Sequence, residues 1–195
     1  MLSTKNDATL VGTEKQVQAL DREIVLSLEK IDLGAHVGVA RALNFVRRNN
    51  INGADKNIVW THNISSALGE IAFCDMVGVK WNDRFDDGYD GAVLDTGVKW
   101  LVRTTAYQNG NLIIPISAHQ EYNYVLVIDC VDDPKKFKVV GWVNGGLAKQ
   151  AKYYNSRVNA YYVPQSDLLR FDDSMLAVLL NQYKSLNEVK DETQS

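Results

Sequence analysis

The order of elements in this 195-residue chain predicts an α/β (α+β) fold, a central mixed sheet flanked by helices. Two observations support this class: apolar residues recur at helical spacing in the first third, and short β-rich runs bounded by turn residues follow. The sequence shows no internal repeat, no low-complexity segment and no sign of a second domain. The length suits one hydrophobic core, so we expect a single domain over residues 1–195.

Helices are expected first, after a polar and flexible lead-in at residues 1–12. Thr13 and Gln16 have the spacing of a capping box, and apolar residues then keep helical spacing to about Lys30. Two further helices are expected over residues 37–48 and about 63–76. The first of these ends in two arginines, a favourable charge at a helix C-terminus.

Strands are expected next, in a largely antiparallel order, at residues 98–104, 111–117, 124–130, 137–143 and from 160. The dipeptide Asn109-Gly110 predicts a hairpin between the first two strands, and residues 131–136 predict another tight turn. A short helix over 147–154 and a C-terminal helix over 175–186 complete the chain. The polar tail 187–195 is expected to fray.

Composition is that of a soluble globular protein, with 46% hydrophobic and 23% charged residues. The net charge of -3 is less basic than that of most non-specific nucleic-acid binders, although it permits a local basic groove. Cys74 and Cys130 lie in apolar runs outside any C-x-x-C pair, so we expect buried thiols in a reducing cytosol. The polar start and the lack of a long apolar run predict neither a signal peptide nor a membrane span.

Glu70 is the first candidate for a functional residue. It lies on the third predicted helix, on one face with Ala67 and Cys74. A carboxylate among small apolar neighbours is either a partly buried metal ligand or a boundary residue in a salt bridge. The sequence leaves both readings open.

An acidic turn follows this helix, with Asp83, Asp86, Asp87 and Asp90, and Asp95 just beyond. Four acids within eight positions suit a divalent cation that prefers oxygen ligands, but aspartates are also ordinary in solvated turns. The spacing does not match an EF-hand loop. In the next strand, alternation places Leu101 and Arg103 on one face. Arg103 could hold a phosphate or pair with Glu70 or Asp90.

Several segments together resemble the PD-(D/E)XK, restriction-endonuclease-like superfamily, and in particular phage and prophage proteins of that type. They are HNISSALGEIAF, YDG, VRTT, NGNLII, YVLVIDC, VVGWVNGGLAK and AYYVPQSDL, which span roughly residues 60–168. The resemblance implies a nuclease-like core over 59–186, preceded by a helical extension over 13–58. It also implies a location in the cytoplasm, that of the host cell if the chain is phage-encoded.

The same resemblance implies a catalytic site of Glu70, Asp90 and Arg103, in which Glu70 and Asp90 bind magnesium, with manganese as a substitute. Leu101 stands where a second metal-binding acid is expected, and Arg103 where a lysine is expected. Arginine stays protonated, so Arg103 could stabilise negative charge but could not act as a base. Asp95 or Glu121 could replace the lost acid.

A basic and aromatic segment supplies candidates for nucleic-acid binding: Lys149, Lys152 and Tyr154. The alternative is an amphipathic helix with a solvated basic face. His62, before the Glu70 helix, is expected to cap it rather than to act in chemistry.

Three functions remain open from the sequence. The leading one is a metal-dependent nuclease, or nuclease-derived phage protein, acting on DNA phosphodiesters. The second is a catalytically inactive nuclease-fold protein that binds nucleic acid or protein, and the third has no nucleic-acid role. The expected partners are DNA and a second copy in a homodimer.

Overall fold

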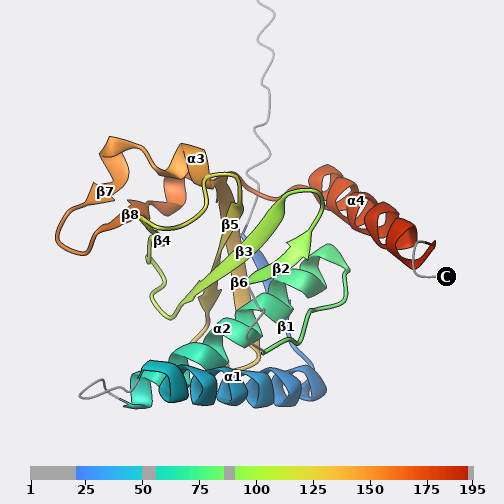
Figure 1. The fold of residues 1–195 in the computed structure, drawn as a ribbon, viewed down its shortest axis with the longest axis horizontal. Helices are drawn as coiled ribbons and strands as arrows, with labels where there is room; N and C mark the ends of the chain where they lie inside the picture. Colours follow the sequence, from blue (N-terminus) through green and yellow to red (C-terminus); the bar gives the residue numbers. More distant parts are fainter. Residues whose placement is uncertain (1–20, 50–55, 86–90, 193–195) are drawn as a thin grey trace, which may run out of the picture.

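The computed structural model describes residues 21–49, 56–85 and 91–192, in which helices pack on a mixed five-stranded sheet (Figure 1). The main elements are β1 (Arg22–Val25), α1 (Leu28–Asn49), α2 (Lys56–Val77), β2 (Ala92–Asp95), β3 (Lys99–Thr105), β4 (Leu112–Pro115), β5 (Asn123–Asp129), β6 (Lys136–Asn144), α3 (Gly145–Ala148), β7 (Tyr154–Asn155), β8 (Ala160–Val163) and α4 (Asp173–Glu192). Short 3-10 turns cover Ala151–Tyr153 and Gln165–Asp167.

The main sheet has the order β1-β6-β5-β3-β2. Strands β3 and β5 are parallel, in register from Trp100 opposite Asn123 to Thr105 opposite Ile128, and the other neighbours are antiparallel. The carboxyl ends of β3 and β5 therefore meet at one edge of the sheet. The expected α+β class and the mixed sheet are confirmed, although the sequence does not indicate which strands run parallel.

The two faces of the sheet contribute to two separate cores. Trp100 and Val102 of β3 face α2, in a core that also holds Phe73 of α2 and Phe171 before α4. Leu101 faces the opposite way, into a core shared with β4 and β8. This alternation is the one that the sequence predicts for the strand.

Helix α2 lies between α1 and the sheet (Figure 1). The approach of α1 to α2 is close because glycines face the partner helix: a Cβ built on Gly38 would lie 2.5 Å from the Cα of Ile64. Gly69 of α2 faces Thr104 of β3, and a Cβ there would overlap the Thr104 hydroxyl. Small residues thus set the position of α2, which carries Glu70.

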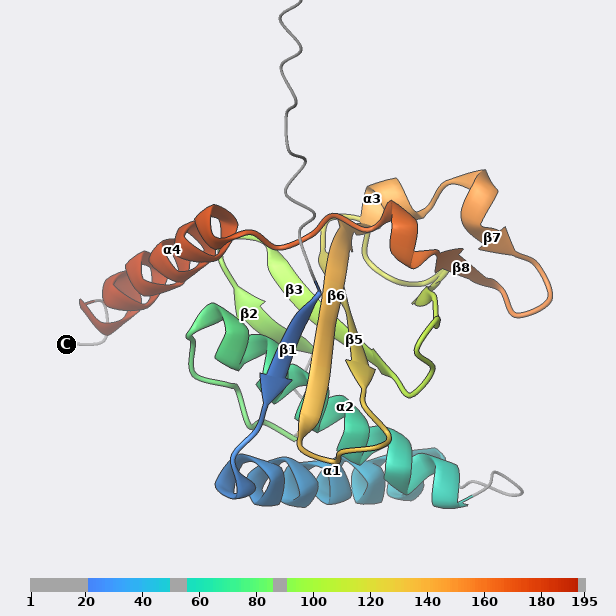
Figure 2. The same ribbon diagram turned by 180° about the vertical axis from the view of Figure 1, so that it is seen from behind.

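The helix expected over residues 13–30 is wrong at residues 22–25, which form strand β1. Residues 13–20 lie outside the described part. β1 pairs antiparallel with β6, from Arg22 opposite Val139 to Val25 opposite Lys136, at the side of the sheet seen in Figure 2. The local pattern of this short segment also suits a helix, and its pairing with β6 makes it a strand. Helix α1 then begins at Leu28, nine residues before the expected helix start.

The hairpin expected at Asn109-Gly110 is wrong. β3 pairs with β5 and β2, whereas β4 joins a second sheet of order β4-β8-β7, with Leu112 opposite Val163. The tight turn expected after β5 is confirmed and joins β5 to β6 as a hairpin.

The helix expected over 147–154 is also wrong, because α3 ends at Ala148 and a 3-10 turn follows at Ala151–Tyr153. The last helix is longer than expected, from Asp173 to Glu192, so most of the tail expected to fray is helical. In the part of the chain that the structure describes, no helix has the length and apolar character needed to cross a membrane.

Candidate functional site

Glu70 is buried, with 6% of its surface exposed, and both of its carboxylate oxygens are occupied. Arg41 Nη1 on α1 donates to Oε1 and Oε2, both at 2.9 Å, and the indole Nε1 of Trp81 donates to Oε2 at 3.1 Å. The guanidinium of Arg41 also lies 5.6 Å from the centroid of the Trp81 ring. Of the two readings of Glu70, these contacts are those of an internal salt bridge.

Arg41 extends this cluster to the first part of the acidic turn. Its Nε and Nη2 donate to the carbonyl oxygen of Arg84, at 3.3 and 3.1 Å, and Asn44 Nδ2 donates to the carbonyl of Phe85 at 2.7 Å. Helix α1 therefore holds the first part of the acidic turn in place.

Cys74 lies one helical turn beyond Glu70 and is fully buried, whereas Cys130 is only half-buried, so the expectation of burial holds for Cys74 alone. Burial, and then the negative charges of Glu70 and Asp75, raise the pKa of the Cys74 thiol far above its usual value. Burial also raises the pKa of Cys130, followed by the effect of Glu23.

These environments predict selective labelling of the two thiols. At pH 8 in native conditions, a maleimide or disulfide reagent is expected to modify Cys130 slowly and to leave Cys74 unmodified, because the thiolate is the reactive form. Both should react after unfolding in guanidinium. Mass spectrometry of digested protein checks this, and rapid native modification of Cys74 would contradict its buried placement.

The described residues do not fit the expected magnesium site. Glu70 is paired with a permanent cation, Leu101 points into the second core, and Asp90 lies outside the described residues, as do Asp86 and Asp87. Among residues 21–49, 56–85 and 91–192, no three His, Cys, Asp or Glu side chains are grouped so that they could hold a metal ion. A metal at Glu70 would require Arg41 to move away.

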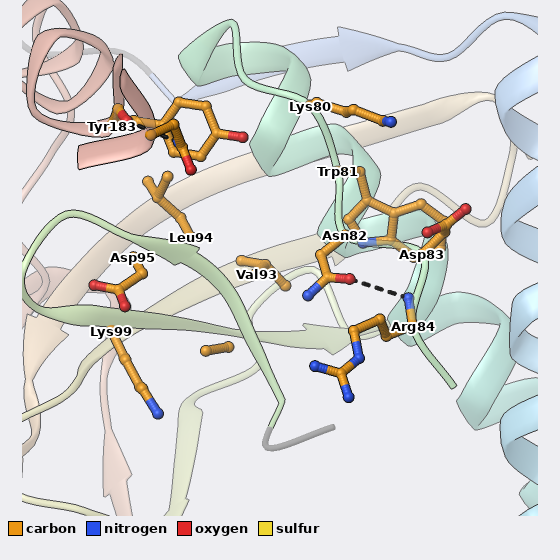
Figure 3. Close-up of a pocket in the computed structure, with 12 residues that line it drawn as sticks. Lys80, Trp81, Asn82, Asp83, Arg84, Val93, Leu94, Asp95, Lys99 and Tyr183 are labelled. Carbon is orange, nitrogen blue, oxygen red and sulfur yellow. Dashed lines mark hydrogen bonds between the residues drawn. The ribbon is translucent and has the colours of Figure 1, made fainter. Parts of the chain in front are cut away.

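The remaining acids of this region are dispersed. Asp83 and Asp95 line a cavity of about 530 Å³ beside Trp81 and lie on opposite sides of it, with Lys80, Arg84 and Lys99 around the rim (Figure 3). Glu121 is exposed and lies 3.2 Å from the Nδ1 of His119. The cavity beside Trp81 therefore has mixed charge, and in the described residues neither Asp95 nor Glu121 joins Glu70 in a group that could hold a metal.

A second cavity, of about 880 Å³, lies where the parallel strands β3 and β5 end; we call it the strand-end groove. It is lined by Thr61, His62 and Ser65 of α2, residues 103–107 of β3 and its turn, Asn111, Ile113 and Pro115 at β4, and Leu126 and Asp129 of β5. In Figure 1 these elements are β4, the end of β3 and the start of α2, on the side of the molecule opposite α4.

Arg103 is the cation of this groove. Its guanidinium lies 6.0 Å from the centroid of the Tyr124 ring, and Tyr124 is fixed by a hydrogen bond from its hydroxyl to the carbonyl of His119 at 3.0 Å. Burial raises the pKa of Tyr124, while the charge of Arg103 acts in the opposite direction. In the described part of the chain, no carboxylate forms an ion pair with Arg103, so the expected pairing with Glu70 is not made.

Hydroxyl groups line the same groove. The Ser65 hydroxyl donates to Asp129 Oδ2 at 2.7 Å, which joins α2 to the end of β5. The Thr104 hydroxyl is buried and has no hydrogen-bond partner among the described residues. The Ser65 proton is thus already used, and the Thr104 hydroxyl faces Gly69 of α2, on the side of β3 opposite Arg103. Arg103 is therefore the group of this groove that is suited to an oxyanion such as a phosphate.

The residues expected to bind nucleic acid lie apart, around the second sheet. Lys149 Nζ donates to the carbonyls of Ile116 and Ala118, so two of its three donors serve the fold. Lys152 lies 4.4 Å from the Tyr153 ring centroid and 3.5 Å from Asp167, and remains largely exposed. Tyr154 bonds Asn159 through its hydroxyl at 2.8 Å.

Sequence reasoning missed the partners of Glu70 and most of the groove. Arg41 lies 29 residues before Glu70, and nothing local links the two. One signal was present: Gly34, Gly38 and Ala42 form a small-residue face on α1, and such a face indicates a closely packed helix beside it.

Comparisons with known proteins give no family. No family model matches the chain, and no solved structure matches it. Beta-porphyranase E of Zobellia galactanivorans is 31% identical over 97 residues, which cover 46% of this chain. The chain spans about a third of the length of that protein, 34%, so this similarity covers part of each protein.

Proposed function

We propose that this protein binds nucleic acid, with DNA as the expected partner, and that it holds the phosphate backbone in the strand-end groove through Arg103. One observation carries the proposal: Arg103 lines the strand-end groove and, in the described residues, no carboxylate forms an ion pair with it, since Asp129 of the same groove accepts its hydrogen bond from Ser65. An arginine in such a place is a phosphate-binding group. The nuclease-like ancestry implied by the sequence motifs agrees with this assignment.

Binding without cleavage is the form of this function that the geometry favours. Glu70, the carboxylate that the motif assigns to metal, accepts hydrogen bonds from Arg41 and Trp81, and Leu101 supplies no ligand. The alternative is magnesium-dependent cleavage through Glu70 and Asp90. That reaction requires the ion pair between Arg41 and Glu70 to break, so that the Glu70 carboxylate can bind the metal.

The proposal predicts that Arg103→Ala weakens DNA binding by about tenfold or more, because one charge-assisted phosphate contact is lost. The measurement is fluorescence anisotropy with labelled DNA at roughly 50 mM salt, where backbone contacts are strong. The slope of log affinity against log salt should also fall by about 0.7–0.9. Lys184→Ala, which removes one exposed charge on α4, is the matched control and should bind like the parent.

The effect of magnesium distinguishes binding without cleavage from magnesium-dependent cleavage. Binding is expected to be the same with magnesium, with manganese and with a chelator, and the DNA should stay intact. Cleavage that is abolished by Asp90→Ala would instead establish the nuclease. If the parent protein binds no DNA, or if Arg103→Ala binds as well as the parent, the proposed groove is wrong.

A further inference from the structure

Tyr107 is the most exposed large aromatic side chain of the described residues, with 78% of its surface exposed, and it lines the strand-end groove. It follows β3 by two residues and Arg103 by four. In the described part of the chain, its ring stacks on no other aromatic ring. An aromatic face is thus presented to solvent beside the arginine of the groove.

The turn that carries Tyr107 is held from two sides. The Tyr107 N–H donates to the Thr105 hydroxyl at 3.3 Å, and the Gly110 N–H donates to the Tyr107 carbonyl at 2.9 Å. From the segment after β8, the Gln165 side-chain amide donates to the carbonyls of Gln108 and Gly110, at 2.8 and 3.0 Å. The backbone under Tyr107 is therefore fixed, although the ring itself makes few contacts.

We propose that the strand-end groove takes single-stranded nucleic acid, with an unpaired base stacked on Tyr107 and a phosphate of the same strand on Arg103. This inference rests on the proposed function and names its substrate class. In a duplex, each base face is covered by its neighbours, so a tyrosine on a turn has no base to stack on. An aromatic platform beside a cationic groove is the arrangement by which proteins bind single strands with little regard to sequence.

Gln165 is a positioning residue in this arrangement. Its amide donates to two carbonyls of the turn, and Gln165 does not line the groove, so its role is to hold the backbone that carries Tyr107. Loss of this amide should lower affinity for single strands more than affinity for duplex, because only the stacking contact depends on the turn.

The test is a titration of two labelled probes, a single-stranded DNA of about 16 nucleotides and the blunt duplex of the same sequence. The parent should prefer the single strand. Tyr107→Ala should lower single-strand affinity by about 5- to 150-fold, the range that stacking on one aromatic gives, and leave duplex affinity unchanged. Tyr107→Phe should retain the preference, since the ring face remains.

One further variant serves as a control and another as a second test. Phe45→Ala removes another exposed aromatic ring, 44% exposed, from α1 and should leave both affinities unchanged. Gln165→Ala should reduce the ratio of single-strand to duplex affinity. Circular dichroism of each variant checks that the fold is intact.

The possible failures are distinct. If the parent binds neither probe, the proposed function fails, and this inference with it. If Arg103→Ala weakens binding to both probes while Tyr107→Ala changes neither, DNA binding in the groove stands and the single-strand assignment is overturned. Loss of binding in Tyr154→Ala, with Tyr107→Ala unaffected, would place the strand on the second sheet instead.

Discussion

Replacement of Arg41 by alanine is expected to lower the free energy of unfolding by about 3–5 kcal/mol. The side chains of Arg41 and Glu70 are 11% and 8% exposed, so the carboxylate left behind would be a buried charge that has lost the Arg41 guanidinium. The Arg84 carbonyl would lose its two donors as well. Both losses destabilise the folded state.

Urea unfolding followed by tryptophan fluorescence measures this change, with the double variant Arg41→Met, Glu70→Met as the comparison. Removing both charges and keeping the volume is often nearly neutral for a buried pair, although here the Trp81 N–H would lose its acceptor. The double variant is therefore expected to be more stable than Arg41→Ala. If the two are equally unstable, packing and not charge explains the loss.

The same variant tests whether Glu70 can bind metal. If Glu70 is only a structural ion-pair partner, magnesium should leave the unfolding midpoint of both the parent and Arg41→Ala unchanged. A midpoint that rises with magnesium in the parent would show that a metal ligand set exists in the native state. That result would favour the nuclease and contradict the proposal of binding without cleavage.

The sequence pattern predicts the buried face correctly where an element is long enough to show helical spacing or strand alternation. The alternation in β3 correctly placed Trp100 and Leu101 on opposite faces, and the spacing around Glu70 correctly placed it on a packed helix face. Residues 22–25 were misread because four residues fit either period, and their pairing with β6 lies more than 110 residues ahead in the chain. The hairpin at Asn109-Gly110 failed for a related reason: the partner of β4 is β8, about fifty residues later.

The site was less predictable than the fold because its contacts are non-local. Arg103 could be singled out as a cation on a strand, but the groove around it needs Ser65 from α2 and Asp129 from β5. The platform at Tyr107 depends on Gln165, which lies 55 residues beyond Gly110. No spacing rule within one segment joins these residues.

Gly38→Ala is expected to destabilise the protein by up to about 2 kcal/mol, although alanine is the better helix former by about 1 kcal/mol. The new Cβ would lie 2.5 Å from the Cα and 2.8 Å from the N of Ile64. Both are backbone atoms, so no rotamer change relieves the overlap and α1 must move away from α2. Overpacking of this kind typically destabilises by about 1–3 kcal/mol, which exceeds the gain in helix propensity.

Gly34→Ala is the matched control, on the same helix and with the same gain in propensity. Its Cβ would lie 2.6 Å from Leu68 Cδ2 and 2.9 Å from Ile71 Cδ1, the ends of flexible side chains that can shift. We expect its unfolding midpoint in urea to stay within error of the parent or to rise. Because α2 carries both Glu70 and Ser65, Gly38→Ala should also weaken DNA binding, while Gly34→Ala should not. Equal stability of the two variants would mean that α1 and α2 can separate at Gly38 without penalty, and that small residues do not set the position of the helix on which the groove is built.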